Sequence, residues 1–269
     1  MRYLILFPEG RQHAFTLSYD DGQVFDKRLV EMFNKYGLKA TFHLNAGTLG
    51  IKNDIDEFVK WEEIKDLYAG HEVACHGFTH PWYTQLPKSR LVQEMIDDKR
   101  ELEKVMGYPV RGMSYPYGVY SDEICDVART LGIEYSRTVG DTNEFHIPND
   151  FLMWHPTCHH NADVFALTDK LLNPAHYVEL QLFYVWGHSF EFVRENNWDR
   201  MEEFCKKISG HDNIWYATNI QIKEYICAAK SLVATVEHDA VYNPSALPIW
   251  LMTEDKNVVK VQPGELKKF

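Results

Sequence analysis

Two adjacent carboxylates stand where the first predicted strand ends, and their chemistry points to a bound cation. Asp20 and Asp21 lie in segment 18–22, whose sequence is SYDDG. Neighbouring carboxylates repel each other, so a cation between them stabilises the ionised pair. Gly22 permits a sharp backbone turn that lets both side chains reach one site. If no other ligands lie nearby, the same residues describe an ordinary Asp-Gly turn.

Two histidines follow the third predicted strand, in segment 75–81 (CHGFTHP). Because residues four apart fall on one face of a helical turn, the rings of His76 and His80 can bind one metal ion. With Asp21 they form a set of two imidazoles and one carboxylate that leaves coordination positions open. Such a set predicts a hydrolytic metal site, with Zn²⁺ as the first choice and Co²⁺, Ni²⁺ or Fe²⁺ as alternatives.

Three further segments that end predicted strands carry polar residues. Segment 113–118 (MSYPYG) predicts a rigid turn whose backbone N–H groups face the site. Segment 184–191 (YVWGHSFE) places His188 at a strand end. Segment 153–160 (MWHPTCHH) is either a polar loop entering a helix or a pocket wall formed by Cys158 or His159, and nothing in it calls for a second metal.

Short strand patterns alternate with helical patterns along most of the chain. Strands are predicted at 14–17, 39–44, 72–75, 111–114, 134–138, 151–154, 178–186 and 214–217, and helices at 25–36, 61–68, 89–106, 121–131, 161–172, 198–207 and 220–233. Seven or eight such units predict an α/β fold with a mainly parallel sheet that closes into a (β/α) barrel. The alternative is an open doubly wound sheet, but the first strand is not followed by a Gly-rich phosphate loop.

The placement of the motifs at strand ends predicts a shared site. Barrel enzymes carry their catalytic groups at the carboxyl ends of the strands, which is where all the segments above fall. We expect the barrel to occupy residues 1–234. Residues 235–269 contain short strand patterns separated by turn residues and predict a β-rich appendage, because so short a segment cannot bury a core of its own.

Composition and charge exclude several classes of protein. The 269 residues are 45% hydrophobic and 25% charged, as in globular proteins. The net charge of -11 and the scattered basic residues argue against nucleic acids and anionic membranes as partners. Five cysteines without a CxxC pair indicate reduced thiols. The apolar run 3–7 is too short for a signal peptide, so we expect a cytoplasmic protein that does not span a membrane.

The order and spacing of the motifs over residues 14–190 resemble the polysaccharide deacetylase superfamily, which includes chitin and peptidoglycan deacetylases. Segment 18–22 is similar to the family motif Thr-Phe-Asp-Asp-Gly, and segment 76–80 is similar to His-(Ser/Thr)-x-x-His except at Gly77. The resemblance implies a distorted (β/α) barrel. It also implies roles for five residues, with Asp20 as general base, His188 as general acid, and Asp21, His76 and His80 as metal ligands.

Two parts of the family pattern are missing. The third motif of the family begins with an arginine that orients the base, and this chain has Ser114 there. Either Arg111 reaches in instead or the role is absent. The fourth motif, of the Asp-Trp type, has no clean match, and its candidates are Asp141 and Trp154.

The predicted activity is hydrolysis of an N-acetyl or O-acetyl group on a carbohydrate. Asp20 would take a proton from the attacking water, the backbone N–H of Tyr117 would help to stabilise the oxyanion, and His188 would protonate the leaving group. The residues expected to contact the substrate are Trp82, Arg111, Tyr117, His159 and Trp186.

Two alternatives to a carbohydrate deacetylase remain open at this point. The first is hydrolysis of a C–N bond in a small non-sugar amide, which the missing arginine and the missing export signal both favour. The second is a carbohydrate-binding protein without catalysis, against which the retained Asp20 argues.

Overall fold

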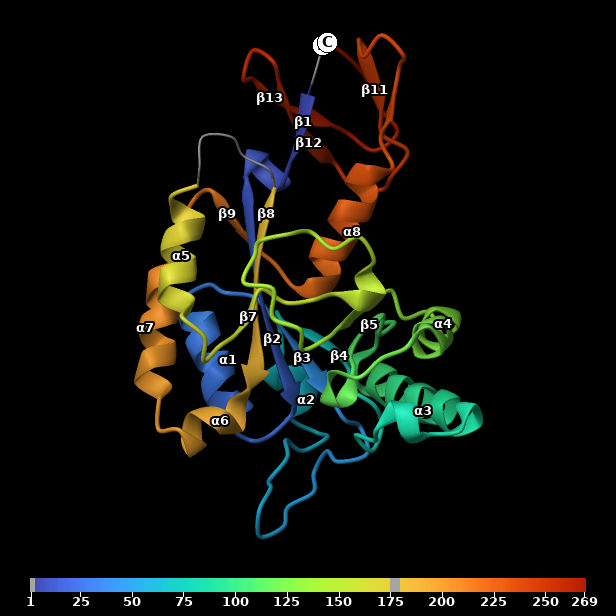
Figure 1. The fold of residues 1–269 in the computed structure, drawn as a ribbon, viewed down its shortest axis with the longest axis vertical. Helices are drawn as coiled ribbons and strands as arrows, with labels where there is room; N and C mark the ends of the chain where they lie inside the picture. Colours follow the sequence, from blue (N-terminus) through green and yellow to red (C-terminus); the bar gives the residue numbers. More distant parts are fainter. Residues whose placement is uncertain (1–2, 175–179) are drawn as a thin grey trace.

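Eight parallel strands form one sheet that curves into a distorted barrel (Figure 1). The computed structural model describes residues 3–174 and 180–269. The strands of this sheet are β2 (His13–Asp21), β3 (Ala40–Leu44), β4 (Glu72–Cys75), β5 (Gly112–Ser114), β6 (Tyr135–Arg137), β7 (Cys158–His159), β8 (Gln181–His188) and β9 (Ile214–Tyr216). Their order is β6-β5-β4-β3-β2-β8-β7, and β9 also pairs with β2. The predicted α/β barrel class is therefore confirmed.

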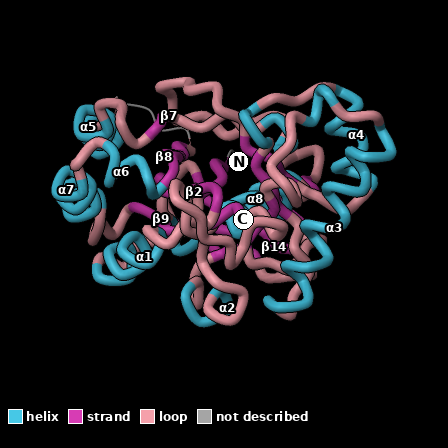
Figure 2. Tube along the Cα trace, turned by 90° about the horizontal axis from the view of Figure 1, so that it is seen from below, coloured by secondary structure: helices cyan, strands magenta, loops and turns pink. Residues whose placement is uncertain are grey.

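The helices are α1 (Asp26–Lys35), α2 (Ile64–Leu67), α3 (Lys88–Met106), α4 (Asp122–Thr130), α5 (Val164–Leu172), α6 (Ser189–Arg194), α7 (Trp198–Ile208) and α8 (Asn219–Lys230). Most of the helices lie around this sheet, whereas α8 lies near the centre of the end-on view (Figure 2). The alternation of strands and helices follows the predicted order. None of the helices in the described part of the chain combines the length and the apolar character that a membrane span requires.

The barrel closes through one irregular segment between β6 and β8. The Trp154 N–H donates to the Ser136 carbonyl (3.0 Å), and the Thr138 N–H donates to the Trp154 carbonyl (3.0 Å). A few residues later, β7 pairs in parallel with β8. The segment thus borders β6 first and β8 second, which makes the barrel distorted.

The strand predicted at 151–154 is wrong. Phe151–Met153 forms a short 3-10 helix instead, because the Asp150 side chain accepts a hydrogen bond from the Leu152 N–H (2.8 Å) and caps its first turn. Only Trp154, the last residue of the predicted strand, makes a sheet-like bridge, to Arg137.

Several other boundaries differ from the predicted ones. The helix predicted at 89–106 begins one residue earlier, at Lys88, after Pro87. The last predicted helix ends at Lys230, and Val233 already belongs to a strand. Of the strand predicted at 178–186, residues 178–179 lie outside the described part of the chain, and β8 continues to His188.

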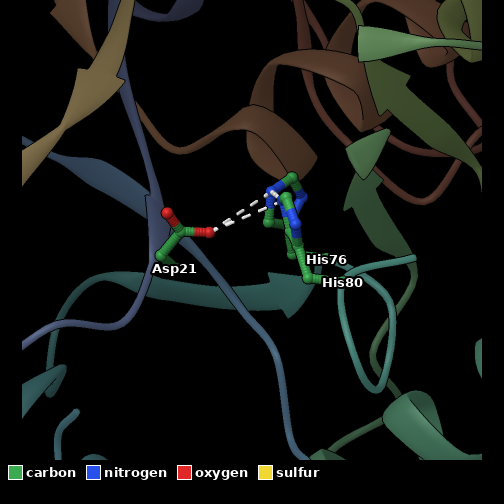
Figure 3. A group of neighbouring side chains, drawn as sticks. All are labelled: Asp21, His76 and His80. Atoms are coloured by element: carbon green, nitrogen blue, oxygen red, sulfur yellow. Dashed lines mark hydrogen bonds and ion pairs between the residues drawn. The ribbon is translucent and has the colours of Figure 1, made fainter. Parts of the chain in front are cut away.

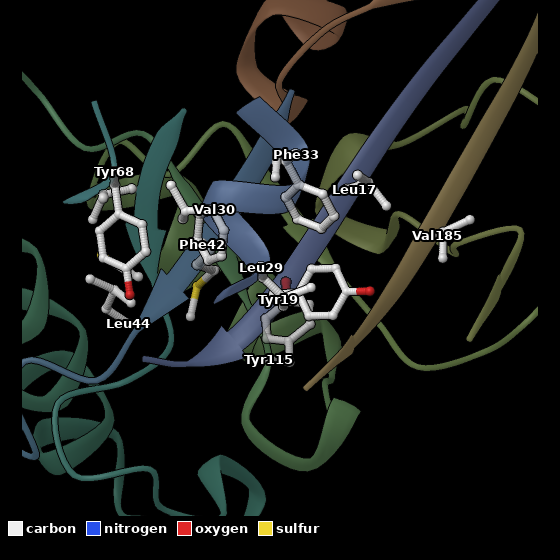
Figure 4. Close-up of a cluster of buried hydrophobic side chains, with 14 of the residues drawn as sticks. Leu17, Tyr19, Leu29, Val30, Phe33, Phe42, Leu44, Tyr68, Tyr115 and Val185 are labelled. Atoms are coloured by element: carbon white, nitrogen blue, oxygen red, sulfur yellow. The ribbon is translucent and has the colours of Figure 1, made fainter. Parts of the chain in front are cut away.

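The side chains of β2 alternate between two environments. Phe15, Leu17 and Tyr19 belong to the hydrophobic cluster between the sheet and the helices, where Tyr19 packs on Phe33 of α1 (Figure 4). The alternate residues Thr16, Ser18 and Asp20 are polar and buried. Since successive side chains of a strand point to opposite faces, these polar residues point into the barrel, where Thr16 donates to Asn219 (2.8 Å).

The C-terminal residues form the predicted β-rich appendage, which recruits strands from elsewhere. One sheet contains β1 (Tyr3–Leu6), β12 (Ile249–Thr253) and β13 (Val258–Val261), and the other contains β10 (Val233–Ala234), β11 (Ala240–Tyr242) and β14 (Leu266–Lys268). The N-terminal strand β1 was not predicted to join them. Figure 1 shows the appendage at the end of the barrel where β2 begins, opposite the carboxyl ends of the strands.

His71, a buried histidine before β4, links α1 to β3. Its Nδ1 accepts a hydrogen bond from the Ala40 N–H (3.1 Å), and its Nε2 lies 3.2 Å from Asn34 Oδ1. Burial, with a smaller contribution from Lys39, lowers the pKa of His71 to about 4. The folded protein therefore keeps this ring neutral at a pH where the unfolded chain protonates it.

We predict that His71 makes the fold sensitive to mild acid. Because the pKa of His71 is lowered by folding, the stability that its neutral form allows is lost as the pH falls from about 6.5 to about 4. Each pKa unit corresponds to about 1.4 kcal/mol, so the loss should approach 3 kcal/mol. Urea unfolding of wild type and His71→Asn, which keeps an acceptor for Ala40, should give free energies of unfolding that diverge over this range. Parallel pH curves would contradict the prediction.

Candidate active site

The candidate catalytic and metal-binding side chains lie at the carboxyl ends of five neighbouring strands, β8, β2, β3, β4 and β5. Asp20 and Asp21 end β2, and the register pairs Asp20 with His188 of β8 on one side and with His43 of β3 on the other. His76 directly follows β4, and Ser114 ends β5. The parallel strands therefore place carboxylates, imidazoles and a hydroxyl at the same end of the barrel.

The side chains of Asp21, His76 and His80 converge on one point (Figure 3). His76 Nε2 and His80 Nε2 lie 3.1 Å apart, and Asp21 Oδ1 lies 3.6 Å from the first and 3.8 Å from the second. Asp21 and His80 both adopt left-handed backbone conformations, with φ of 78° and 55°. Strained conformations of this kind cost about 1 kcal/mol or more each and are typical of functional sites.

The protonation state of His76 makes this group suitable for a cation. Its Nδ1 lies 2.9 Å from the Ser114 carbonyl, which can only accept, so Nδ1 carries the proton. Burial lowers the pKa of His76 well below its usual range, so the ring stays neutral and its Nε2 presents a lone pair to His80 and Asp21. Two imidazoles and a carboxylate whose potential ligand atoms converge on one point fit a divalent cation such as Zn²⁺.

Asp20 lies beside this group and is held as an anion. Its carboxylate contacts the guanidinium of Arg137, accepts a hydrogen bond from Ser114 Oγ (3.2 Å) and lies 3.4 Å from His43 Nδ1. Burial alone would raise the pKa of the Asp20 carboxyl, but the Arg137 guanidinium beside it holds this pKa well below its usual range. Asp20 Oδ2 is 3.7 Å from His76 Nε2, so an ionised carboxylate adjoins the three candidate metal ligands.

Arg137 fills the place for which the sequence suggested Arg111. Arg137 ends β6, is fully buried, donates from Nε to Ser18 Oγ (3.2 Å) and stacks its guanidinium over the Trp186 ring (4.4 Å). The sequence analysis missed it, although it ends a predicted strand like the other motifs.

The expectation for Arg111 was wrong. This residue precedes β5 and lies at the opposite end of the strand from the site. There it forms ion pairs with Glu134 (3.3 Å) and Glu224 (2.6 Å), so its guanidinium cannot reach Asp20.

His188 faces Asp20 across the strand pair and has an acidic partner that the sequence analysis did not identify. Its Nδ1 lies 3.2 Å from Glu191 Oε2, and its backbone N–H donates to the same oxygen (3.0 Å). Burial lowers the pKa of His188, but the Glu191 hydrogen bond and the charges of Asp20 and Asp21 outweigh it and raise the pKa. Glu191 thereby favours the protonated imidazole.

The rim of the site is aromatic on the side of β4 and β5. Trp82 and Tyr117 stack with centroids 4.0 Å apart and are 43% and 45% exposed. The Tyr117 ring also contacts the edge of His80 (4.4 Å), and its backbone is left-handed, with φ of 59°. These two predicted contact residues therefore lie next to the cation ligands.

On the opposite side, Trp186 is anchored by Asp141. The indole Nε1 donates to Asp141 Oδ1 (2.7 Å), and Asp141 Oδ2 accepts from the His159 N–H (2.8 Å). Asp141, one of two candidates for the fourth family motif, thus supports the wall of the site. Trp154, the other candidate, lies in the hydrophobic cluster with Tyr184 and does not reach the site.

Comparison with known proteins finds similarity to deacetylases. Residues 8–136 match the family model described as polysaccharide deacetylase. Chitin deacetylase 1 of Cryptococcus neoformans is 24% identical over 147 residues, which cover 51% of this chain and 30% of that protein. Peptidoglycan-N-acetylmuramic acid deacetylase PdaC of Bacillus subtilis is 26% identical over 118 residues, or 43% of this chain and 24% of that protein. The chain therefore matches only about a third or less of the length of these relatives.

A solved structure supports the fold over a longer range. The crystal structure of a putative polysaccharide deacetylase from Mycobacterium smegmatis superposes with a TM-score of 0.63 over 84% of this chain and 94% of that chain, at 16% identity. At such low identity the comparison establishes the architecture alone.

We predict that Arg137 is essential for stability because it neutralises a buried carboxylate. Arg137→Leu should lower the free energy of unfolding in urea by about 3–5 kcal/mol, since it leaves Asp20 buried and unpaired. The double variant Arg137→Leu with Asp20→Asn should recover about 2 kcal/mol of this loss, because it removes the stranded charge. Arg111→Leu serves as the control, since its ion pairs are one-third exposed and should contribute about 0–1 kcal/mol. Equal losses in the two single variants would contradict the prediction.

Proposed function

We propose that the protein is a metal-dependent hydrolase that removes an acetyl group from an N-acetylated or O-acetylated carbohydrate. The premise is that residues 8–136 belong to the polysaccharide deacetylase superfamily, whose family model they match. One observation carries the proposal. The ionised Asp20 lies 3.7 Å from His76, beside a ligand set of two imidazoles and a carboxylate. A base next to a cation is what hydrolysis by an activated water requires.

Asp21, His76 and His80 would hold the cation. When bound, a divalent ion such as Zn²⁺ supplies positive charge that lowers the pKa of a water and polarises a carbonyl. Ser114 keeps the proton of His76 on Nδ1, which leaves Nε2 as the ligand atom. Asp98 accepts the His76 backbone N–H (2.9 Å) and fixes the loop that carries the ring.

Asp20 would act as the general base. Arg137 and Ser114 hold its carboxylate in one orientation, so that it can accept the proton of a water that attacks the acetyl carbon. Because Arg137 holds the pKa of the Asp20 carboxyl below its usual range, the group is ionised and has a lone pair available to accept a proton.

His188 would act as the general acid. Glu191 favours its protonated form, so the imidazolium can donate a proton to the departing amine or alkoxide. The backbone N–H of Tyr117 would donate to the oxyanion, and the exposed rings of Trp82 and Tyr117 offer flat apolar surfaces to the faces of a sugar.

The alternative that the substrate is a small non-sugar amide now has less support. It rested partly on the lack of an arginine behind the base, and Arg137 now occupies that place. The same residues can still hydrolyse other amides, so the substrate must be tested directly.

We predict zinc-dependent release of acetate that requires Asp20. Acetate should be measured from acetylated mono- and oligosaccharides with wild type and Asp20→Asn, each stripped with a chelator and then reloaded with Zn²⁺. Zinc should restore wild-type activity, whereas Asp20→Asn should bind zinc and lose about 10²–10⁴-fold in kcat. Bound zinc without acetate from any sugar would favour the non-sugar amide or a binding protein. Failure of zinc to bind would refute the metal site.

We predict that the need for His188 depends on the leaving group. A sugar amine must be protonated to depart, whereas nitrophenolate leaves as a stable anion. His188→Gln should therefore lower kcat by about 10²–10⁴-fold for an N-acetylated sugar and much less for 4-nitrophenyl acetate. An equal loss with both substrates would argue against the acid role.

A further inference from the structure

The role of segment 153–160, left open by the sequence, follows from the contacts of His159. Its Nε2 lies 3.0 Å from Glu191 Oε2, the oxygen that also contacts His188. Glu191 is buried, and its other oxygen accepts from Arg194 (3.2 Å). The carboxylate behind His188 is thus held from two sides, by a histidine and by an arginine.

The tautomer of His159 is fixed by the backbone. The Asn161 N–H donates to His159 Nδ1 (3.2 Å), so Nδ1 carries no proton in the neutral ring. The proton of the neutral imidazole is then on Nε2, which points at Glu191. The chain of hydrogen bonds therefore runs in one direction, from the Asn161 backbone through His159 to Glu191.

The same geometry argues against a second metal at this cluster. His159, His160 and Glu191 bring potential ligand atoms within 4.8 Å of one another. However, a proton on His159 Nε2 leaves that atom no lone pair for a cation, and Glu191 Oε2 already accepts from the His188 N–H (3.0 Å). His160 stacks on Phe192 (4.2 Å) in the core, and its ring nitrogens make no hydrogen bond, although its Nε2 lies 3.5 Å from the same Glu191 oxygen.

The backbone of His159 is held as firmly as its ring. Its N–H donates to Asp141 Oδ2 (2.8 Å), and the neighbouring strand pairs His159 with Trp186 of β8. The ring also meets the Trp186 indole edge-on, with centroids 4.8 Å apart. The backbone and the ring of His159 are therefore both fixed, so His159 can fix the position of Glu191 in turn.

We infer that His159 is a positioning residue that fixes Glu191, and through it His188, in a His159–Glu191–His188 relay. This inference rests on the proposed function of His188 as general acid. It assigns His159 to the support of the acid and not to the wall that contacts the substrate. Loss of outer-shell hydrogen bonds of this kind commonly lowers activity about 10–100-fold.

The test compares three variants on two substrates. His159→Phe removes the donor but keeps a ring beside Trp186, whereas His159→Gln supplies an amide N–H in its place. His146→Phe is the matched control, because His146 is exposed and belongs to another part of the surface. We expect His159→Phe to lower kcat about 10-fold for an N-acetylated sugar, with little change in KM and little effect on 4-nitrophenyl acetate. His159→Gln should restore most of the activity, and His146→Phe should behave as wild type.

A double-mutant cycle separates this inference from the proposed function. If His159 acts through His188, adding His159→Phe to His188→Gln should cause little further loss. Additive losses, or a loss in His159→Phe that is equal for both substrates, would overturn the relay while leaving the acid role intact. If His188→Gln itself shows no dependence on the leaving group, the acid role fails first. Urea unfolding of each variant identifies any that lose activity by unfolding.

Discussion

The buried ion pair between Asp20 and Arg137 is the interaction on which the mouth of the barrel depends. A carboxylate removed from water costs several kcal/mol unless it is neutralised or paired with good geometry. Asp20 lies on β2, near the middle of the sheet, and Arg137 comes from β6 at its end. The pair therefore spans the barrel interior and links strands that are not neighbours. Trp186 covers the guanidinium, so the wall of the site and the charge of the base depend on the same arginine.

The alternation of β2 explains why this charge is inside the barrel at all. The strand buries Phe15, Leu17 and Tyr19 under the helices, and the period of two sends the residues between them inward. Ser18 contacts Arg137 one layer below the base. On β2 the residues between the hydrophobic ones are Thr16, Ser18 and Asp20, and Asp20 is the last of this polar series before the backbone turns at Gly22.

The sequence predicted those parts of the site that are local in the chain. Asp20 and Asp21 are adjacent, His76 and His80 are four residues apart in a loop that is not the expected helical turn, and the parallel sheet brings both pairs to one end of the barrel. Arg137 was missed because it lies 117 residues from Asp20 in the chain and meets it only in the fold. Glu191 lies three residues after His188, so this partnership is local and could have been inferred from segment 184–191. The strand at 151–154 failed for a local reason, since the Asp150 cap outweighed the strand preference of the residues that follow.

Asp20 and His188 are paired neighbours on β2 and β8, yet the side chains behind them have opposite charges. Arg137 lies behind Asp20 and favours its anion, while Glu191 lies behind His188 and favours its cation. Two titratable groups on paired strands are thereby pushed toward opposite protonation states, as the proposed roles of base and acid require. Under the proposed function, the exposed rim where Trp82 and Tyr117 stack is the surface available to discriminate between substrates.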